Sequence, residues 1–136
     1  MNEIRIVIAD DSEPVLYMLG ELLKADYDVV ASAGDGRAAV EATQRLKPEL
    51  VLLDISMPIV DGFEAAREIK EIRPSALVIF VSEHREKVYA EVAFSVGASG
   101  YVIKSKMITE LLPAIREALA GREYGRPAPT GAHLRI

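Results

Sequence analysis

Cysteine is absent from this sequence of 136 residues. The chain therefore forms no disulfide, holds no zinc ion through thiolates and carries no cysteine nucleophile. A chain without cysteine suits a reducing cytosol, and we expect a cytoplasmic protein.

Long hydrophobic runs are also missing. The longest, such as Leu50–Leu53 and Ala76–Val81, are far shorter than the roughly 20 residues that a membrane-spanning helix requires. Residues 1–5 lack the apolar core of a signal peptide. The sequence therefore predicts no association with a membrane.

Basic residues are outnumbered, because 16 Lys and Arg stand against 21 Asp and Glu and give a net charge of −5. Nucleic-acid binding draws much of its free energy from Lys and Arg that contact phosphates. We therefore expect no direct contact between these residues and nucleic acid.

Half of the residues are apolar, which is enough for one domain with a buried core. Short runs rich in Val, Ile and Leu predict strands. They are Ile4–Ala9, Val29–Ala33, Leu50–Leu53, Leu77–Val81 and Tyr101–Ile103. Most are apolar at successive positions, as in a parallel sheet that helices cover on both faces.

Helical patterns follow these runs. The first begins near Pro14, with Asp11 and Ser12 as candidate caps. The others are Arg37–Leu46, Gly62–Ile72, Glu86–Val96 and about Thr109–Ala120. We expect Pro113 in the first turn of the last helix. Alternation of strand and helix with short connections predicts an open, doubly wound α/β fold.

The end of the chain differs from the rest in composition. Residues 122–136 contain glycine and proline breakers and show no apolar periodicity. We therefore assign residues 1–121 to one domain and residues 122–136 to a C-terminal tail or linker.

Polar residues close the predicted strands. Asp10 and Asp11 follow the first strand and Asp54 follows the third. Ser82 follows the fourth and Lys104 the fifth. Ligands of doubly wound sheets bind beyond the carboxyl ends of the strands, where the strand order reverses. We therefore expect these residues to meet at one edge of the sheet.

Carboxylates at such an edge repel one another and resist joint ionisation unless a cation is present. An all-oxygen site favours a hard cation, and Mg²⁺ is the natural choice, with Ca²⁺ and Mn²⁺ as alternatives. A carboxylate can also act as a nucleophile and form an aspartyl phosphate. A metal ion and the Lys104 ammonium would then neutralise charge on the transferring group.

The same residues also have ordinary structural interpretations. Asp10 and Asp11 could cap the first helix, and Ser82 could cap the fourth. Lys104 could be a solvated surface charge, and Tyr101 a core aromatic. The presence of another aspartate at the end of the third strand favours a metal site over capping.

Residues 34–39 read Gly-Asp-Gly-Arg-Ala-Ala and fit a dinucleotide-binding fingerprint, with Asp54 about 20 residues further on. Such a site would leave Asp10, Ser82 and Lys104 without a role, and the second mononucleotide-binding half is missing. The sequence contains no P-loop, Gly-x-Ser-x-Gly elbow or His-Glu-x-x-His motif. NTPase, hydrolase and metalloprotease functions therefore find no support.

Separate motifs follow one another on the predicted strand ends. They are Asp10-Asp11, Asp54-Ile55-Ser56-Met57-Pro58 followed by Asp61-Gly62, Val81-Ser82, and Gly97-Ala98-Ser99-Gly100-Tyr101-Val102-Ile103-Lys104. In these motifs residues 4–121 resemble the receiver domains of two-component response regulators. Ser105, where many receivers have proline, makes the chain similar to the NarL/FixJ (LuxR-type) subfamily. The resemblance implies a flavodoxin-like (βα)5 three-layer sandwich, with a parallel five-stranded sheet in the order 2-1-3-4-5.

The resemblance also implies a role for each site residue. Asp54 would be the phosphoacceptor and Lys104 would contact the phosphoryl group. Asp10 and Asp11 would bind Mg²⁺, together with Asp54 and the backbone carbonyl of Ser56.

Further roles concern signalling. Ser82 would be the switch hydroxyl and Tyr101 the switch aromatic. The positions of Ser56 and His84 would tune how fast the phosphoryl group is lost.

The implied function is that of a phosphoacceptor domain served by a sensor histidine kinase. It would assist its own phosphorylation and dephosphorylation without being an enzyme otherwise. It would control an output, transcription through a DNA-binding domain beyond this chain, and could dimerise when phosphorylated. A pseudo-receiver that signals by protein contacts alone is the competing hypothesis, and a Mg²⁺ titration separates the two.

Overall fold

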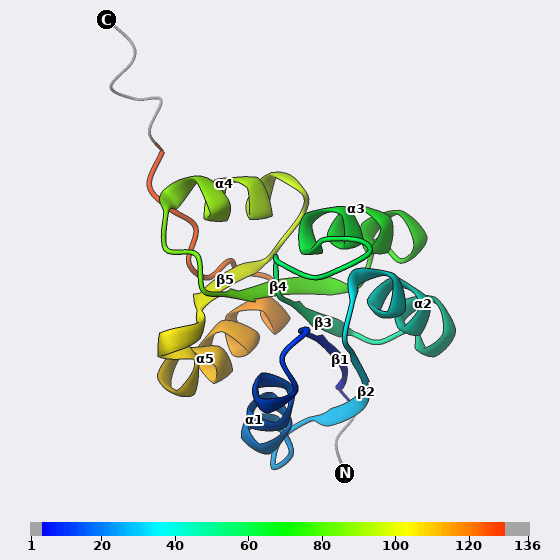
Figure 1. Ribbon diagram of the computed structural model, residues 1–136. Coiled ribbons are helices and arrows are strands. Elements are labelled where there is room, and N and C mark those ends of the chain that lie inside the picture. Colours follow the sequence, from blue (N-terminus) through cyan, green and yellow to red (C-terminus); the bar gives the residue numbers. More distant parts are fainter. Residues whose placement is uncertain (1–3, 130–136) are drawn as a thin grey trace, which may run out of the picture.

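A computed structural model describes residues 4–129 of the chain (Figure 1). Its strands are β1 (Arg5–Ala9), β2 (Asp28–Ala33), β3 (Leu50–Leu53), β4 (Leu77–Ser82) and β5 (Gly100–Ile103). They form one parallel sheet in the order β2-β1-β3-β4-β5. The predicted flavodoxin-like fold and its strand order are confirmed.

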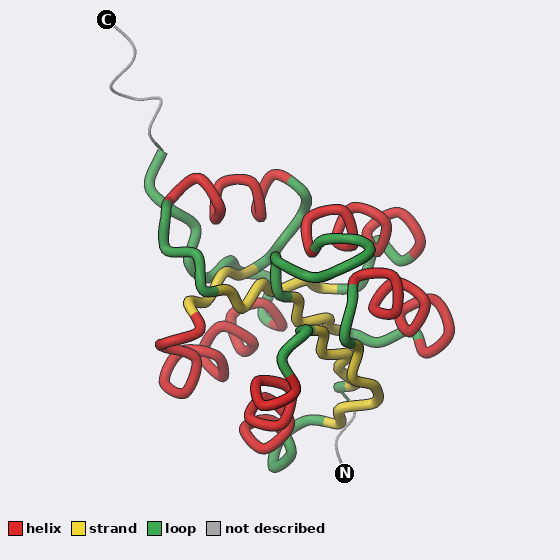
Figure 2. Tube along the Cα trace, viewed as in Figure 1, coloured by secondary structure: helices red, strands yellow, loops and turns green. Residues whose placement is uncertain are grey.

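Helices cover both faces of this sheet. They are α1 (Glu13–Leu23), α2 (Gly36–Leu46), α3 (Gly62–Ile72), α4 (Lys87–Ser95) and α5 (Met107–Leu119), the last preceded by a 3-10 turn, η1 (Lys104–Lys106). Helices α1 and α5 lie on one face, and α2, α3 and α4 lie on the other (Figures 1 and 2). The result is the predicted three-layer sandwich.

Strand β3 shows why the successive apolar pattern predicts a buried strand. Its residues Leu50–Leu53 are all buried. Val51 and Leu53 pack into the core beside α2 and α3, whereas Leu50 and Leu52 pack into the core beside α1 and α5. Burial of each such side chain contributes about 1.5–3 kcal/mol, and a polar residue on either face would lose that contribution.

Three helices begin at a side-chain cap that the sequence supplies. Ser12, Asp35 and Asp61 each accept a hydrogen bond from the backbone N–H three residues further along the chain. Each cap satisfies an N–H group that the helix itself leaves free. Helix α4 begins after Glu86 without a side-chain cap.

The prediction that Pro113 lies in the first turn of the last helix is wrong. Helix α5 starts at Met107, directly after the 3-10 turn, and Pro113 lies inside the helix. Proline has no backbone N–H and so leaves one helical hydrogen bond unmade. Fully buried Leu111, Ala114 and Ile115 hold this helix on the sheet despite the interruption.

Residues 122–129 continue past α5 along the outer edge of the sheet, where Tyr124 forms a parallel bridge with Gly100. Residues 130–136 of the predicted tail lie outside the described residues. Residues 1–3, at the start of the predicted domain, lie outside them as well. Within residues 4–129, no helix combines the length and the apolar character that crossing a membrane requires.

Candidate functional site

The carboxyl ends of the two central strands carry the buried aspartates. Ala9 of β1 pairs with Leu53 of β3, so Asp10 and Asp54 each lie one residue beyond the same register position. The N–H of Asp54 donates to the Ala9 carbonyl at 3.0 Å. The strand register therefore places both carboxyl groups at one height above the sheet.

The site contains three carboxylates and one ammonium group. Carboxylate oxygens of Asp10, Asp11 and Asp54 lie within 4.8 Å of one another. Lys104, which follows β5, places its Nζ 2.7 Å from Asp10 Oδ2 and 3.2 Å from Asp54 Oδ2. Asp10 and Asp54 are buried, whereas Asp11 is exposed. The structure thus brings together the four charged residues that the sequence analysis selected.

Burial and neighbouring charges shift the pKa values of Asp54 and Lys104. Burial raises the pKa of the Asp54 carboxyl, and the charge of Asp10 raises it further, while Lys104 and the Ile55 N–H offset part of the rise. Burial alone would lower the pKa of Lys104, but hydrogen bonds and charges from Asp10 and Asp54 outweigh it and raise that pKa. The site therefore favours a positive charge next to Asp54.

The remaining carboxylate oxygens are held by the backbone. Oδ1 of Asp10 accepts from the Ser12 N–H at 2.9 Å, and Oδ1 of Asp54 accepts from the Ile55 N–H at 2.8 Å. The cap of α1 is Ser12, not Asp10 or Asp11. Capping therefore does not account for the two aspartates.

A hollow of about 200 Å³ opens above Asp54. It is lined by Asp11, Ser12, Asp54, Ser56, Glu83, His84 and Lys104. At its rim the Ser56 hydroxyl and His84 Nε2 are 3.3 Å apart. The His84 ring also stacks on Tyr89 of α4, with ring centroids 4.0 Å apart. The two residues predicted to tune phosphoryl loss thus lie together at the entrance.

Ser82 and Tyr101 do not line the hollow but are both hydrogen-bonded to the short loop after β4. The buried Ser82 hydroxyl accepts from the His84 N–H at 3.0 Å, and the Tyr101 hydroxyl donates to the His84 carbonyl at 2.8 Å. Burial raises the pKa of Tyr101, which keeps its hydroxyl protonated as a donor. Tyr101 is therefore connected to the site through the loop after β4 and not by lining the hollow.

The sequence did not indicate the close backbone packing at Gly62 and Gly36, or the presence of Glu83 near the site. A Cβ on Gly62 would lie 2.0 Å from the Asp54 carbonyl oxygen, and one on Gly36 would lie 1.8 Å from the Val60 carbonyl oxygen. Both positions therefore accept only glycine. Glu83 adds a carboxylate to the rim of the hollow, and no motif indicated it beforehand.

The close packing at Gly36 also answers the dinucleotide alternative. Asp35 caps α2, and Gly36 lets the loop before α3 approach the start of that helix. The protein's own backbone thus occupies the space beside the second glycine of the fingerprint, where a pyrophosphate would have to approach.

The donor set fits a divalent cation. Three carboxylates face a single ammonium, so the site keeps an excess of negative charge, and its ligand atoms are oxygens. Hard cations such as Mg²⁺ prefer oxygen ligands and carboxylates above all. A cation would lessen the repulsion that raises the pKa of Asp54.

Comparison with known proteins places this geometry in a family. Residues 6–116 match the response regulator receiver domain. The chain is 34% identical over 131 residues to the transcriptional regulatory protein DegU of Brevibacillus brevis, covering 95% of this chain and 56% of the relative. It is 34% identical over 115 residues to the chemotaxis protein CheY of Halobacterium salinarum, covering 85% of this chain and 96% of that protein.

A solved structure shows the same fold. The LuxR-family two-component response regulator from Aurantimonas sp. SI85-9A1 superposes with a TM-score of 0.85 at 35% identity, covering 90% of this chain and 89% of that one. The chain spans little more than half the length of DegU and of the PdtaR regulator of Mycobacterium tuberculosis. Such coverage is typical of a receiver domain compared with proteins that also carry other parts. The chain belongs to the response regulator receiver domain family of two-component systems, and the NarL/FixJ (LuxR-type) resemblance is confirmed.

Proposed function

We propose that Asp54 accepts a phosphoryl group from the phosphohistidine of a sensor histidine kinase. The observation that carries this proposal is the position of the Asp54 carboxylate, at the floor of an open hollow with the Lys104 ammonium 3.2 Å from Oδ2. A buried carboxylate beside a cation, open on one side, is suited to attack on phosphorus.

In the proposed step, an Asp54 carboxylate oxygen forms a bond to phosphorus while the phosphorus–nitrogen bond of the donor breaks. The electron pair of the broken bond stays on the histidine ring. Lys104 stabilises the negative charge on the transferring oxygens. Because Ile55 N–H holds Oδ1 of Asp54, Oδ2 is the oxygen that faces Lys104.

Residues of the site would hold Mg²⁺ through the carboxylates of Asp10, Asp11 and Asp54 and the backbone carbonyl of Ser56. When bound, the ion would supply positive charge for the phosphoryl oxygens. Asp10 and Asp54 both form ion pairs with Lys104, so Lys104 and Mg²⁺ would bind to the same carboxylates.

The signal would leave the site through Ser82 and Tyr101. A phosphorylated aspartate adds roughly −1.5 to −2 charge and strong acceptor oxygens. The Ser82 hydroxyl, now bound to the His84 N–H, could turn to donate to those oxygens. The loop that carries His84 would then move towards Asp54, and Tyr101, whose hydroxyl is bound to the His84 carbonyl, would be held in its buried position behind Ser82.

The tuning role of Ser56 and His84 is proposed from their place at the rim. Both side chains would lie between the phosphoryl group and incoming water, so their size and polarity would set the rate of hydrolysis.

Domains of this family are signalling domains, and we propose that this one assists its own phosphorylation and dephosphorylation only. Residues 1–121 would form the receiver and residues 122–136 a tail or linker. The relatives named as transcriptional regulators suggest a DNA-binding output domain in the parent protein. Cytoplasmic location and dimerisation upon phosphorylation complete the proposal.

Intact mass tests the acceptor directly. The protein is incubated with Mg²⁺ and acetyl phosphate, as wild type, Asp54→Asn and Asp61→Asn. Asp61 is an exposed cap of α3, and asparagine caps a helix equally well, so Asp61→Asn is the matched control. We expect one phosphoryl adduct in the wild type and the control and none in Asp54→Asn. An equal adduct in all three would exclude Asp54 as the acceptor, and the lack of any adduct or of Mg²⁺ binding would favour a pseudo-receiver.

A further inference from the structure

The residues after α5 form a short edge segment, residues 122–127, that pairs with β5. The Tyr124 N–H donates to the Ser99 carbonyl at 3.0 Å, and the Tyr101 N–H donates to the Tyr124 carbonyl at 2.9 Å. This is the bonding pattern of a parallel bridge. Since β5 is the edge strand of the sheet, the edge segment satisfies backbone groups that the sheet leaves open.

Gly125 makes this pairing possible. Its φ of +87° is a conformation that favours glycine. A Cβ on Gly125 would lie 2.4 Å from the Tyr101 carbonyl oxygen. The edge segment can therefore lie against Tyr101 only while residue 125 has no side chain.

The edge segment also joins the two helices on either side of β5. Tyr124 packs against the core beside α5. Arg126 places its guanidinium 4.7 Å from the centre of the Phe94 ring of α4, a cation–π contact. Movement of α4 relative to α5 would thus strain the docked edge segment.

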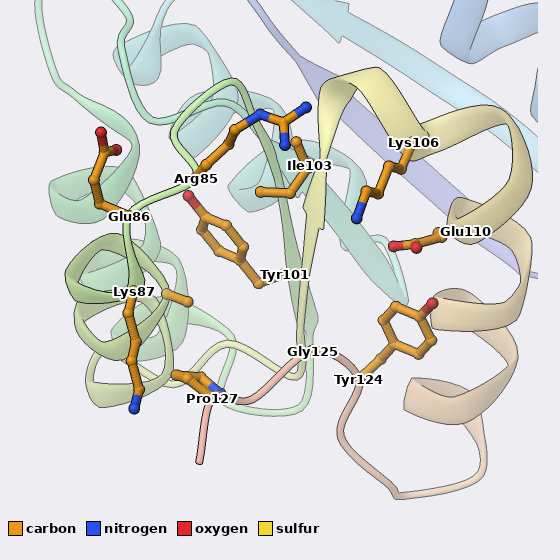
Figure 3. A pocket seen from close by; sticks show the side chains of 11 residues that line it. Arg85, Glu86, Lys87, Tyr101, Ile103, Lys106, Glu110, Tyr124, Gly125 and Pro127 are labelled. Carbon is orange, nitrogen blue, oxygen red and sulfur yellow. The ribbon is translucent and has the colours of Figure 1, made fainter. Parts of the chain in front are cut away.

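A cleft of about 410 Å³ lies over β5 between the start of α4 and the η1–α5 side, with the edge segment at one end (Figure 3). Tyr101 and Ile103 of β5 and Lys106 of η1 line it, and Tyr124 and Gly125 close it from the edge segment. The cleft is the free space beside the Tyr101 ring.

The docked edge segment is therefore connected to the Asp54 site by successive contacts. Tyr101 is bonded to the edge segment through its N–H and to the His84 carbonyl through its hydroxyl. The His84 N–H in turn donates to the Ser82 hydroxyl, and His84 itself lines the hollow. One residue, Tyr101, thus binds both the edge segment and the loop behind the phosphoacceptor.

We propose that the edge segment is an intramolecular ligand of β5 whose docking favours the buried position of Tyr101 and thereby favours phosphorylation at Asp54. The coupling part rests on the proposed function of Asp54. By linkage, the free energy by which docking stabilises the phosphorylated state equals the free energy by which phosphorylation stabilises docking.

Docking is tested by hydrogen exchange of the Tyr101 and Tyr124 amides in the full chain. Gly125→Ala removes the docked position, and Gly121→Ala is the matched control, because Gly121 also has a positive φ of +84° but a Cβ there meets nothing within 4 Å. We expect Gly125→Ala to lower the protection of both amides about tenfold or more, with little change in Gly121→Ala. Arg126→Met should lower protection less. Unchanged protection in Gly125→Ala would overturn the proposal.

Coupling is tested with the phosphoryl mimic beryllofluoride and Mg²⁺. We expect the mimic to raise Tyr124 protection in the wild type and to bind Gly125→Ala about fivefold more weakly, while Gly121→Ala binds it like the wild type. Equal affinity in all three proteins, with the wild type binding well, would overturn the coupling alone. A wild type that does not bind the mimic at all would overturn both the coupling and the function proposed for Asp54.

Discussion

The centre of the sheet and its outer edge are built differently. At the centre, Asp54 follows a strand that is buried on both faces, and Gly62 packs against its carbonyl with no room for a methyl group. At the edge, β5 is completed by an exposed segment around Gly125, beside an open cleft. The comparison teaches that the charged groups are fixed by close packing, while the part that can respond lies where packing is loose.

Alanine substitutions at Gly62 and Gly125 should show the largest difference between the centre and the edge. Gly62→Ala should lower the free energy of unfolding by about 3 kcal/mol, because strands and helix must separate to admit the methyl group. Gly125→Ala, with a similar clash, should lower it by no more than about 0.5 kcal/mol, because the edge segment can undock. Urea denaturation measures both. Equal losses would show that centre and edge are one rigid unit.

Removal of the ammonium at the centre should have the next largest effect. Without Mg²⁺, Lys104→Met leaves the buried Asp10 and Asp54 with no cation. We expect this substitution to lower the free energy of unfolding by about 2 kcal/mol at neutral pH. Added Mg²⁺ should restore part of it. Lys106 is an exposed lysine close by in the sequence, so Lys106→Met is the control and should change the free energy of unfolding little. If both variants behave alike, Lys104 does not compensate the buried carboxylates.

The pH dependence of stability tests the raised pKa of Asp54. In the folded protein the carboxyl binds its proton at a higher pH than in the unfolded chain, so ionised Asp54 lowers stability above the folded pKa. Without Mg²⁺, Asp54→Asn should therefore be about 1 kcal/mol more stable than the wild type at neutral pH. The difference should shrink as the pH falls through the folded pKa towards the unfolded value. A variant less stable than the wild type at neutral pH would contradict this.

The link between centre and edge should give the smallest effect. Tyr101→Phe removes the hydrogen bond to the His84 carbonyl and should cost about 0.5–1.5 kcal/mol. Tyr17→Phe, at a side chain that is 70% exposed, should cost nothing measurable. Thermal unfolding of both variants checks the difference, and an equal result would mean that the Tyr101 hydroxyl bond is not stabilising.

The strands and the charged site were predictable because each depends on local chemistry. An uninterrupted apolar run such as Leu50–Leu53 fits a strand with two covered faces, and parallel strands bring Asp10, Asp54 and Lys104 to one edge. The exact start of α5 was not predictable, because a 3-10 turn joins it to β5 and places Pro113 inside the helix.

Contacts between distant segments were also beyond the sequence. The Ser56–His84 contact depends on the path of two loops. The pairing of Tyr124 with β5 depends on backbone hydrogen bonds and on the left-handed conformation of Gly125. Neither contact produces a periodic pattern in the sequence. A tail that contains Gly and Pro is therefore predicted to be a linker even where it pairs with a strand.

Chemical mapping of the phosphorylated residue tests the central claim most directly. After treatment with acetyl phosphate and Mg²⁺, borohydride reduces an aspartyl phosphate to homoserine, which peptide mass spectrometry locates. We predict homoserine at position 54 alone, and its loss when the metal is removed with EDTA. Homoserine at Asp10, Asp11 or Asp61, or an equal yield at position 54 without metal, would contradict an Asp54 acceptor that works with a bound cation.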